Sequence, residues 1–141
     1  MRKSILTNGI KAIIGVNSIA AVISLIFWIL VMFKIFIQSN TGITMDIMSK
    51  ASTLGFLIAD IFLAVPILMI SIPGLLRLSS WGWTFAQMAN ILWIYSLASL
   101  WTRDIYTGLI TPGDIIFLPF GLFSIWSINY LWRNKSKFNI L

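Results

Sequence analysis

Four long apolar stretches, separated by short polar segments, follow one another along the chain. They cover residues 12–37, 52–76, 80–101 and 114–132. A helix needs about 20 residues to cross the hydrocarbon core of a bilayer, and each stretch is close to that length or longer. Helix is the expected conformation, because a backbone that faces lipid must satisfy its own hydrogen bonds. The pattern therefore predicts an all-α fold, a four-helix transmembrane bundle that forms a single domain over residues 1–141.

The composition agrees with this pattern and excludes a soluble domain. Of the 141 residues, 59% are hydrophobic and 10% are charged, whereas a soluble domain carries about 25% charged residues. A soluble chain of this length cannot bury so much apolar surface. We expect an integral protein of a prokaryotic plasma membrane. The first apolar stretch exceeds the roughly 7–15 apolar residues of a cleaved signal peptide, so we expect a retained helix.

The distribution of basic residues predicts the orientation of the bundle. One side of the predicted membrane carries Lys34, Lys50 and Arg103 together with three of the four Asp residues. The other side holds both termini and the second polar connection, with seven of the ten basic residues: Arg2, Lys3, Lys11, Arg77, Arg133, Lys135 and Lys137. Basic residues accumulate on the cytoplasmic side, which predicts an N-in/C-in topology. The formal net charge of +6 is thus assigned to cytoplasmic loops, and we expect no nucleic-acid partner.

Most of the side chains that usually carry catalysis or hold metals are missing. The chain contains no Cys, no His and no Glu, and its four acidic residues are all Asp. Without Cys there is no disulfide and no thiolate nucleophile. Without His the usual general base and the usual zinc ligand are absent. We therefore expect no enzymatic activity, no cofactor and no bound metal.

Asp60 is the polar residue of greatest interest, because an ionisable side chain inside a membrane costs free energy and often has a function. At a rise of about 1.5 Å per residue, Tyr95 of the antiparallel third stretch lies at a similar depth, where its hydroxyl could bond the carboxyl group. Three roles are open for Asp60: fixing helix packing, handling a proton or cation, and pairing with another subunit. Pro66 frees the carbonyl of Phe62 and predicts a kink beside Asp60.

A second group of polar residues lies in the cytoplasmic half of the predicted bundle and consists of Asn17, Gln87, Asn90 and Asn129. Gln87 and Asn90 are three residues apart and share one helix face. We expect this group to form hydrogen bonds between helices, worth about 0.6 kcal/mol each on average. A solute pathway that links this group to Asp60 is the alternative, and no motif supports it.

Small residues recur at four-residue spacing in the second stretch, at Ala51, Gly55 and Ala59. Such a stripe permits the close approach of another helix. Asp60 directly follows the stripe, so we expect Asp60 to face protein rather than lipid. The motif is common in membrane helices and identifies no particular partner.

These features favour a non-enzymatic accessory or assembly subunit of a larger membrane complex. The small size, the short loops and the lack of catalytic side chains support this interpretation. The alternative is a small oligomeric transporter or channel that uses Asp60, and an enzyme that acts on lipid is the least favoured class. The expected partners are the lipid bilayer and either other membrane protein subunits or further copies of the chain.

Overall fold

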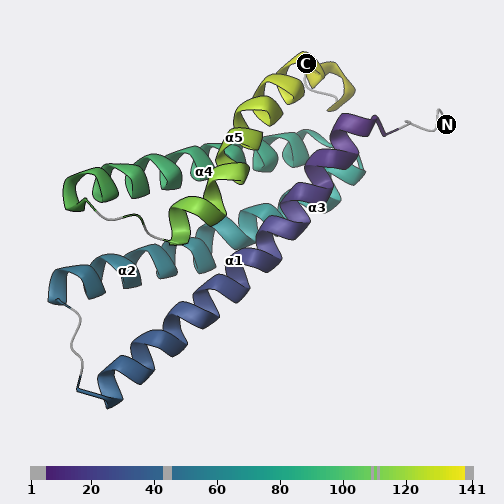
Figure 1. Ribbon diagram of the computed structural model, residues 1–141. Helices are drawn as coiled ribbons and strands as arrows, with labels where there is room; N and C mark the ends of the chain where they lie inside the picture. Colours follow the sequence, from purple (N-terminus) through teal and green to yellow (C-terminus); the bar gives the residue numbers. More distant parts are fainter. Residues whose placement is uncertain (1–5, 43–45, 109, 111, 139–141) are drawn as a thin grey trace.

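The computed structural model describes residues 6–42, 46–108, 110 and 112–138, and this part of the chain is helical without any strand. Its elements are α1 (Asn8–Asn40), α2 (Ile47–Ala59), the π-helical segment η1 (Asp60–Ala64), α3 (Val65–Leu76), α4 (Ser80–Thr107), α5 (Pro112–Arg133) and the 3₁₀ turn η2 (Lys135–Phe138). α2, η1 and α3 follow one another without a break, so four long helices make up the fold (Figure 1).

Each of the four apolar stretches is helical, and most of the helix ends lie a few residues beyond the stretch, while the helices that end at Leu76 and begin at Ser80 match it. In the described part of the chain, α1, the continuous helix Ile47–Leu76 and α5 are long and apolar enough to cross a membrane. α4 is long enough at 28 residues, but it is not apolar enough to join them. Its polar side chains, which include Gln87, Asn90 and Arg103, lower its hydropathy.

A tight hairpin joins α3 to α4. Ser79 is the N-cap of α4, and its hydroxyl accepts a hydrogen bond from the backbone N–H of Gly82 at 3.3 Å. Capping of this kind satisfies a donor that the first helical turn leaves unpaired. Beside the turn, Gly82 packs directly against the backbone of Gly74, so the two helices approach each other as closely as their backbones allow.

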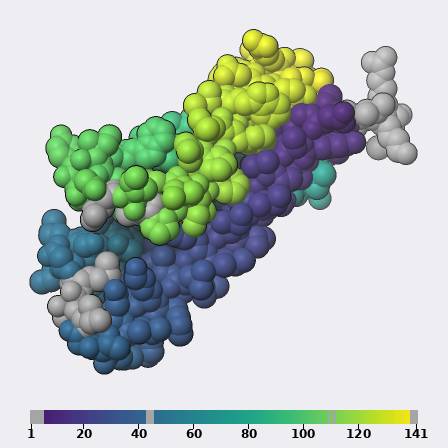
Figure 2. All heavy atoms as spheres, in the orientation of Figure 1, coloured from purple at the N-terminus to yellow at the C-terminus, as the bar shows by residue number. Residues whose placement is uncertain are grey.

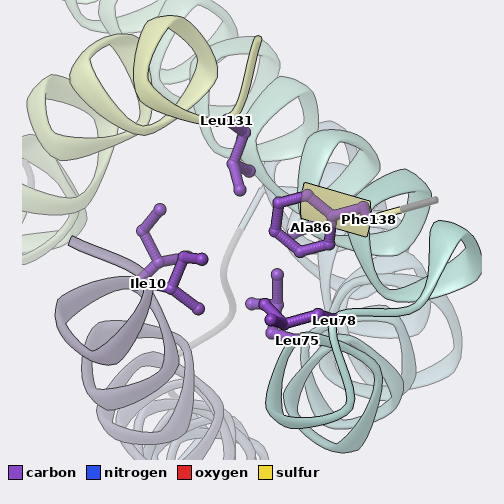
Figure 3. Packing of buried hydrophobic residues seen from close by; sticks show 7 residues of the cluster. Ile10, Leu75, Leu78, Ala86, Leu131 and Phe138 are labelled. Carbon is purple, nitrogen blue, oxygen red and sulfur yellow. The ribbon is translucent and has the colours of Figure 1, made fainter. Parts of the chain in front are cut away.

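Buried apolar residues concentrate in the half of the bundle that holds the start of α1, the α3–α4 hairpin and the end of α5, here called the packed half. One cluster consists of Ile10, Ile13, Leu75, Leu78, Ala86, Leu131 and Phe138 (Figure 3). A second cluster, deeper in the bundle, consists of Ala20, Ala21, Leu68 and Ala89. These residues come from α1, α3, α4, α5 and η2, so the packed half joins all the long helices of the fold.

The opposite half, here called the open half, is packed much more loosely. α2 buries none of its residues, and α1 buries none beyond Trp28. Figure 1 shows α1 and α2 diverging toward the connection between them. In Figure 2 the adjoining ends of α1 and α2 (blue) lie at the opposite end of the molecule from the start of α1 (purple) and the end of α5 (yellow). The open half therefore presents helix faces and cavities that the chain itself does not fill.

The transition between the two halves lies at η1. Pro66 has no N–H, and its ring would clash with the carbonyl group four residues earlier in a regular α-helix. The helix widens instead, and the backbone N–H of Val65 bonds the carbonyl of Asp60, five residues back. This π-bulge is the form taken by the kink that Pro66 predicts, and π-bulges often occur at functional sites.

Candidate functional site

Asp60 begins the π-helical segment, and its carboxyl group is held by α1. The indole Nε1–H of Trp28 donates a hydrogen bond of 2.8 Å to Asp60 Oδ2. Trp28 is only 5% exposed, and a buried indole N–H generally requires a partner of this kind. The predicted partner Tyr95 is placed differently, because its side chain is 64% exposed. Trp28 was detectable in the sequence as a Trp inside an apolar stretch, but the sequence does not show that it faces Asp60.

Three hollows meet at Asp60. The largest, here called the outer cavity, has a volume of about 420 Å³ and lies among α1, α2, α4 and α5. The second, here called the lateral groove, has a volume of about 280 Å³ and runs between the α2–η1 helix and α4. The third is a central pocket of about 20 Å³, close to the size of one water molecule. Asp60 and Ser96 line all three hollows, so this pair connects the lateral groove with the outer cavity.

The outer cavity and the lateral groove differ in charge. Lys34 and Arg103 line the outer cavity in addition to Asp60. The guanidinium of Arg103 donates through Nε to Asp104 Oδ1 at 2.8 Å and lies 2.7 Å from the same oxygen through Nη2. Among the described residues, Asp60 is the only charged one that lines the lateral groove, and Tyr95 also lines it. A ligand therefore meets cationic groups in the outer cavity and none among the groove's lining residues.

Aromatic rings form much of the wall around Asp60. Phe27 packs edge-on against Trp28, with ring centroids 5.1 Å apart, and also against Phe117 at 5.1 Å. Phe117 in turn contacts Trp93 at 5.4 Å. Phe117 lines both the outer cavity and the central pocket, and Trp93 lines the central pocket. The carboxyl group of Asp60 thus shares its hollows with a connected group of rings from α1, α4 and α5.

The second polar group forms hydrogen bonds between helices in the packed half. Asn17 Nδ2 donates to Ser71 Oγ at 2.8 Å and links α1 to α3. Asn90 Nδ2 donates to Ser127 Oγ at 2.9 Å and links α4 to α5. Gln87 makes only longer contacts of 3.5 Å, to Asn90 and to the α5 backbone. Through these bonds Asn17 and Asn90 each join two helices of the packed half.

Asn129 does not join this group. Its side chain is exposed, and Nδ2 donates to the carbonyl of Ile125 on the same helix at 2.9 Å. An amide N–H that donates to a carbonyl of its own helix needs no acceptor on a neighbouring helix. The depth of Asn129 was predictable from the sequence, but the direction of its side chain around the helix was not.

The small-residue stripe likewise has no helix packed directly against it, and its residues Gly55 and Ala59 line the lateral groove between α2 and α4. Ala51, Gly55 and Ala59 are exposed, and a Cβ atom added to Gly55 would meet no other atom within 4 Å. The stripe therefore makes no close approach to another helix of the described chain. Pro66 affects helix packing through the π-bulge that precedes it. Asp60, in the turn that follows the stripe, faces inward toward Trp28.

Chemically, the site combines the carboxyl group of Asp60 with hollows that are lined mainly by apolar and aromatic side chains. Within the described ranges, no group of three or more His, Cys, Asp or Glu residues lies together to bind a metal ion. Asp60 accepts a hydrogen bond from the indole N–H of Trp28 and lines its hollows together with the hydroxyl of Ser96. In the outer cavity, Lys34 and Arg103 are further polar lining residues. Comparisons with protein-family models, with curated proteins and with solved structures find no match to this chain.

Proposed function

We propose that this chain is a non-enzymatic accessory or assembly subunit of a larger membrane complex, with a helix of another subunit packed against α2. The observation that carries the proposal is that α2 buries none of its residues although it belongs to an apolar, span-length helix. Its stripe of Ala51, Gly55 and Ala59 is exposed, and a Cβ atom added to Gly55 would meet no other atom within 4 Å. Association of membrane helices depends on close packing of this type of surface rather than on the hydrophobic effect.

The proposal places both termini in the cytoplasm of a prokaryotic cell. Its support is the charge distribution along the helices. Arg77 in the α3–α4 hairpin and Arg133 at the end of α5 belong to the packed half, where the chain ends also lie. Lys50 and Arg103 belong to the open half. In this orientation the more basic end faces the cytoplasm, as is usual for membrane proteins. Under the same proposal, α4 crosses the bilayer as a helix shielded by its neighbours.

Replacing Gly55 by Leu tests the role of α2. We expect the Gly55→Leu chain to lose at least 90% of the membrane proteins that co-purify with the wild-type chain in mild detergent, because the Leu side chain holds a partner helix away. The measurement is quantitative mass spectrometry of tagged chains purified from native membranes. Gly15→Leu is the matched control, since a Cβ at Gly15 on α1 also meets no atom within 4 Å.

Two results would contradict the subunit proposal. The first is purification of the wild-type chain as a monomer without any stoichiometric partner. The second is retention of the same partners in the same amounts by the Gly55→Leu and Gly15→Leu chains. Elution of both variants at the wild-type position after removal of partners shows that they remain folded.

A second candidate function is that of a small oligomeric transporter or channel, and the junction of three hollows at Asp60 favours it. Under this proposal Asp60→Asn abolishes proton or cation flux in liposomes, with a decrease of at least tenfold, because Asn is isosteric but carries no charge. Asp46→Asn is the control: Asp46 caps α2 by accepting from the N–H of Ser49 at 3.2 Å, and Asn caps helices equally well. Equal flux through both variants would rule out this role for Asp60.

A further inference from the structure

We propose that the Asp60 site binds a lipophilic organic cation, meaning a single positive charge carried by an apolar body, such as a quaternary ammonium or phosphonium ion. The inference deepens the second candidate function by naming a ligand class for the same site. It concerns binding alone, so it is tested without any measurement of transport.

The first argument is the charge left to compensate at Asp60. Oδ2 accepts a hydrogen bond from Trp28, but an indole N–H is neutral and does not cancel the charge of a carboxylate. Among the described residues, the ion pair of Arg103 is made with Asp104 rather than with Asp60. A carboxylate among apolar walls is costly unless a cation accompanies it. A ligand that brings its own positive charge supplies this compensation.

The second argument is the chemistry of the walls. Rings of Trp28, Phe27, Phe117 and Trp93 surround the hollows that Asp60 lines. Aromatic faces attract cations, and they do so most effectively when the cation is weakly hydrated, as an alkylated ammonium is. A small metal ion would lose its hydration shell on entering hollows whose walls are mostly apolar. The few hydroxyl groups here cannot replace the water oxygens as ligands. The walls therefore favour an organic cation over sodium or potassium.

The third argument is access and size. The lateral groove opens onto the face between α2 and α4, and no Lys or Arg in the described part of the chain lines it. It leads to Asp60 and Ser96, where it meets the outer cavity. The volumes of about 280 and 420 Å³ are comparable with those of pockets that hold drug-sized ligands. A lipophilic cation that partitions into the bilayer can reach the groove from the side, without passing the basic groups of the outer cavity.

The experiment measures binding of tetraphenylphosphonium to the full chain in lipid nanodiscs, by equilibrium dialysis. We expect saturable binding to the wild-type chain and a loss of affinity of at least tenfold in Asp60→Asn. Asp46→Asn, whose acid lies at the exposed start of α2, keeps the wild-type affinity. Tetraphenylborate, which has nearly the same shape but the opposite charge, serves as the second probe and is expected not to bind saturably.

The proposal is overturned if Asp60→Asn binds tetraphenylphosphonium as tightly as the wild-type chain, or if tetraphenylborate binds with equal affinity. Should Asp60→Asn fail to fold, Phe117→Leu decides instead: Leu fills most of the ring's space without its π face, so we expect a threefold to tenfold loss of affinity. Unchanged affinity in a folded Phe117→Leu chain would then refute the aromatic site. Binding of tetraphenylphosphonium without any flux would contradict only the transport proposal. Proton flux without binding of tetraphenylphosphonium would contradict only the proposal of an organic-cation site.

Discussion

Gly82→Ala is expected to lower the free energy of unfolding by about 1–3 kcal/mol or more, the usual range for overpacking in a tightly packed interior. The added methyl group would collide with the backbone of Gly74 across the α3–α4 contact, and neither backbone can yield without separating the two helices. The measurement is unfolding in mixed micelles of mild detergent and dodecyl sulfate, followed by tryptophan fluorescence.

The matched control for Gly82→Ala is Gly55→Ala, which makes the same chemical change on α2. A Cβ at Gly55 meets no atom within 4 Å, and Ala favours a helix over Gly by about 1 kcal/mol. We therefore expect Gly55→Ala to be neutral or slightly stabilising. Equal stabilities of the two variants would show that α3 and α4 do not approach as closely as the structure indicates.

Phe138→Ala is expected to cost about 3–5 kcal/mol, the range for truncating a large buried aromatic side chain. Phe138 is fully buried, at 0% exposure, among residues that include Ile10, Leu75 and Leu131 (Figure 3). η2 turns the chain after α5 back onto the packed half, so this single ring closes the cluster at the end that carries the chain termini. The same unfolding measurement applies.

Lys137→Ala is the control for Phe138→Ala, because Lys137 is an exposed neighbour on the same turn. We expect its stability to stay within about 0.5 kcal/mol of wild type, as is usual for surface substitutions. If Phe138→Ala behaved like Lys137→Ala, the ring would not belong to the core, and residues 135–138 would act only as a basic tail.

Much of the fold was predictable because it depends on local properties of the chain. The four helices follow from long apolar stretches, the α3–α4 turn from a capping serine, and the disturbance after Asp60 from the missing N–H of Pro66. Depth along a helix is also local, since each residue adds about 1.5 Å. For this reason the sequence identified Asp60, Asn17 and Asn90 as polar groups inside the bundle.

The direction in which each side chain points was not predictable in the same way. Asn90 and Asn129 look alike as amides in an apolar stretch, yet Asn90 bonds the neighbouring helix and Asn129 bonds its own. The expected partner of Asp60 was Tyr95, whereas Trp28 of α1 provides the bond. Phe138 follows a run of charged residues that indicates a solvated tail, and its burial depends on a cluster built from α1, α3, α4 and α5.

By itself the sequence determined that the chain is helical, which four stretches form its long helices, and that one acid lies within an apolar helix. Only the tertiary structure decided that α2 buries none of its residues, that three hollows meet at Asp60, and that aromatic rings from α1, α4 and α5 surround it. The physical reason is that these helices are apolar on nearly every side. The sequence of an amphipathic helix reveals its buried face through the spacing of apolar and polar residues. A helix without a polar face gives no such signal, because every rotation about its axis buries apolar residues. Packing alone therefore fixes which neighbours each residue contacts.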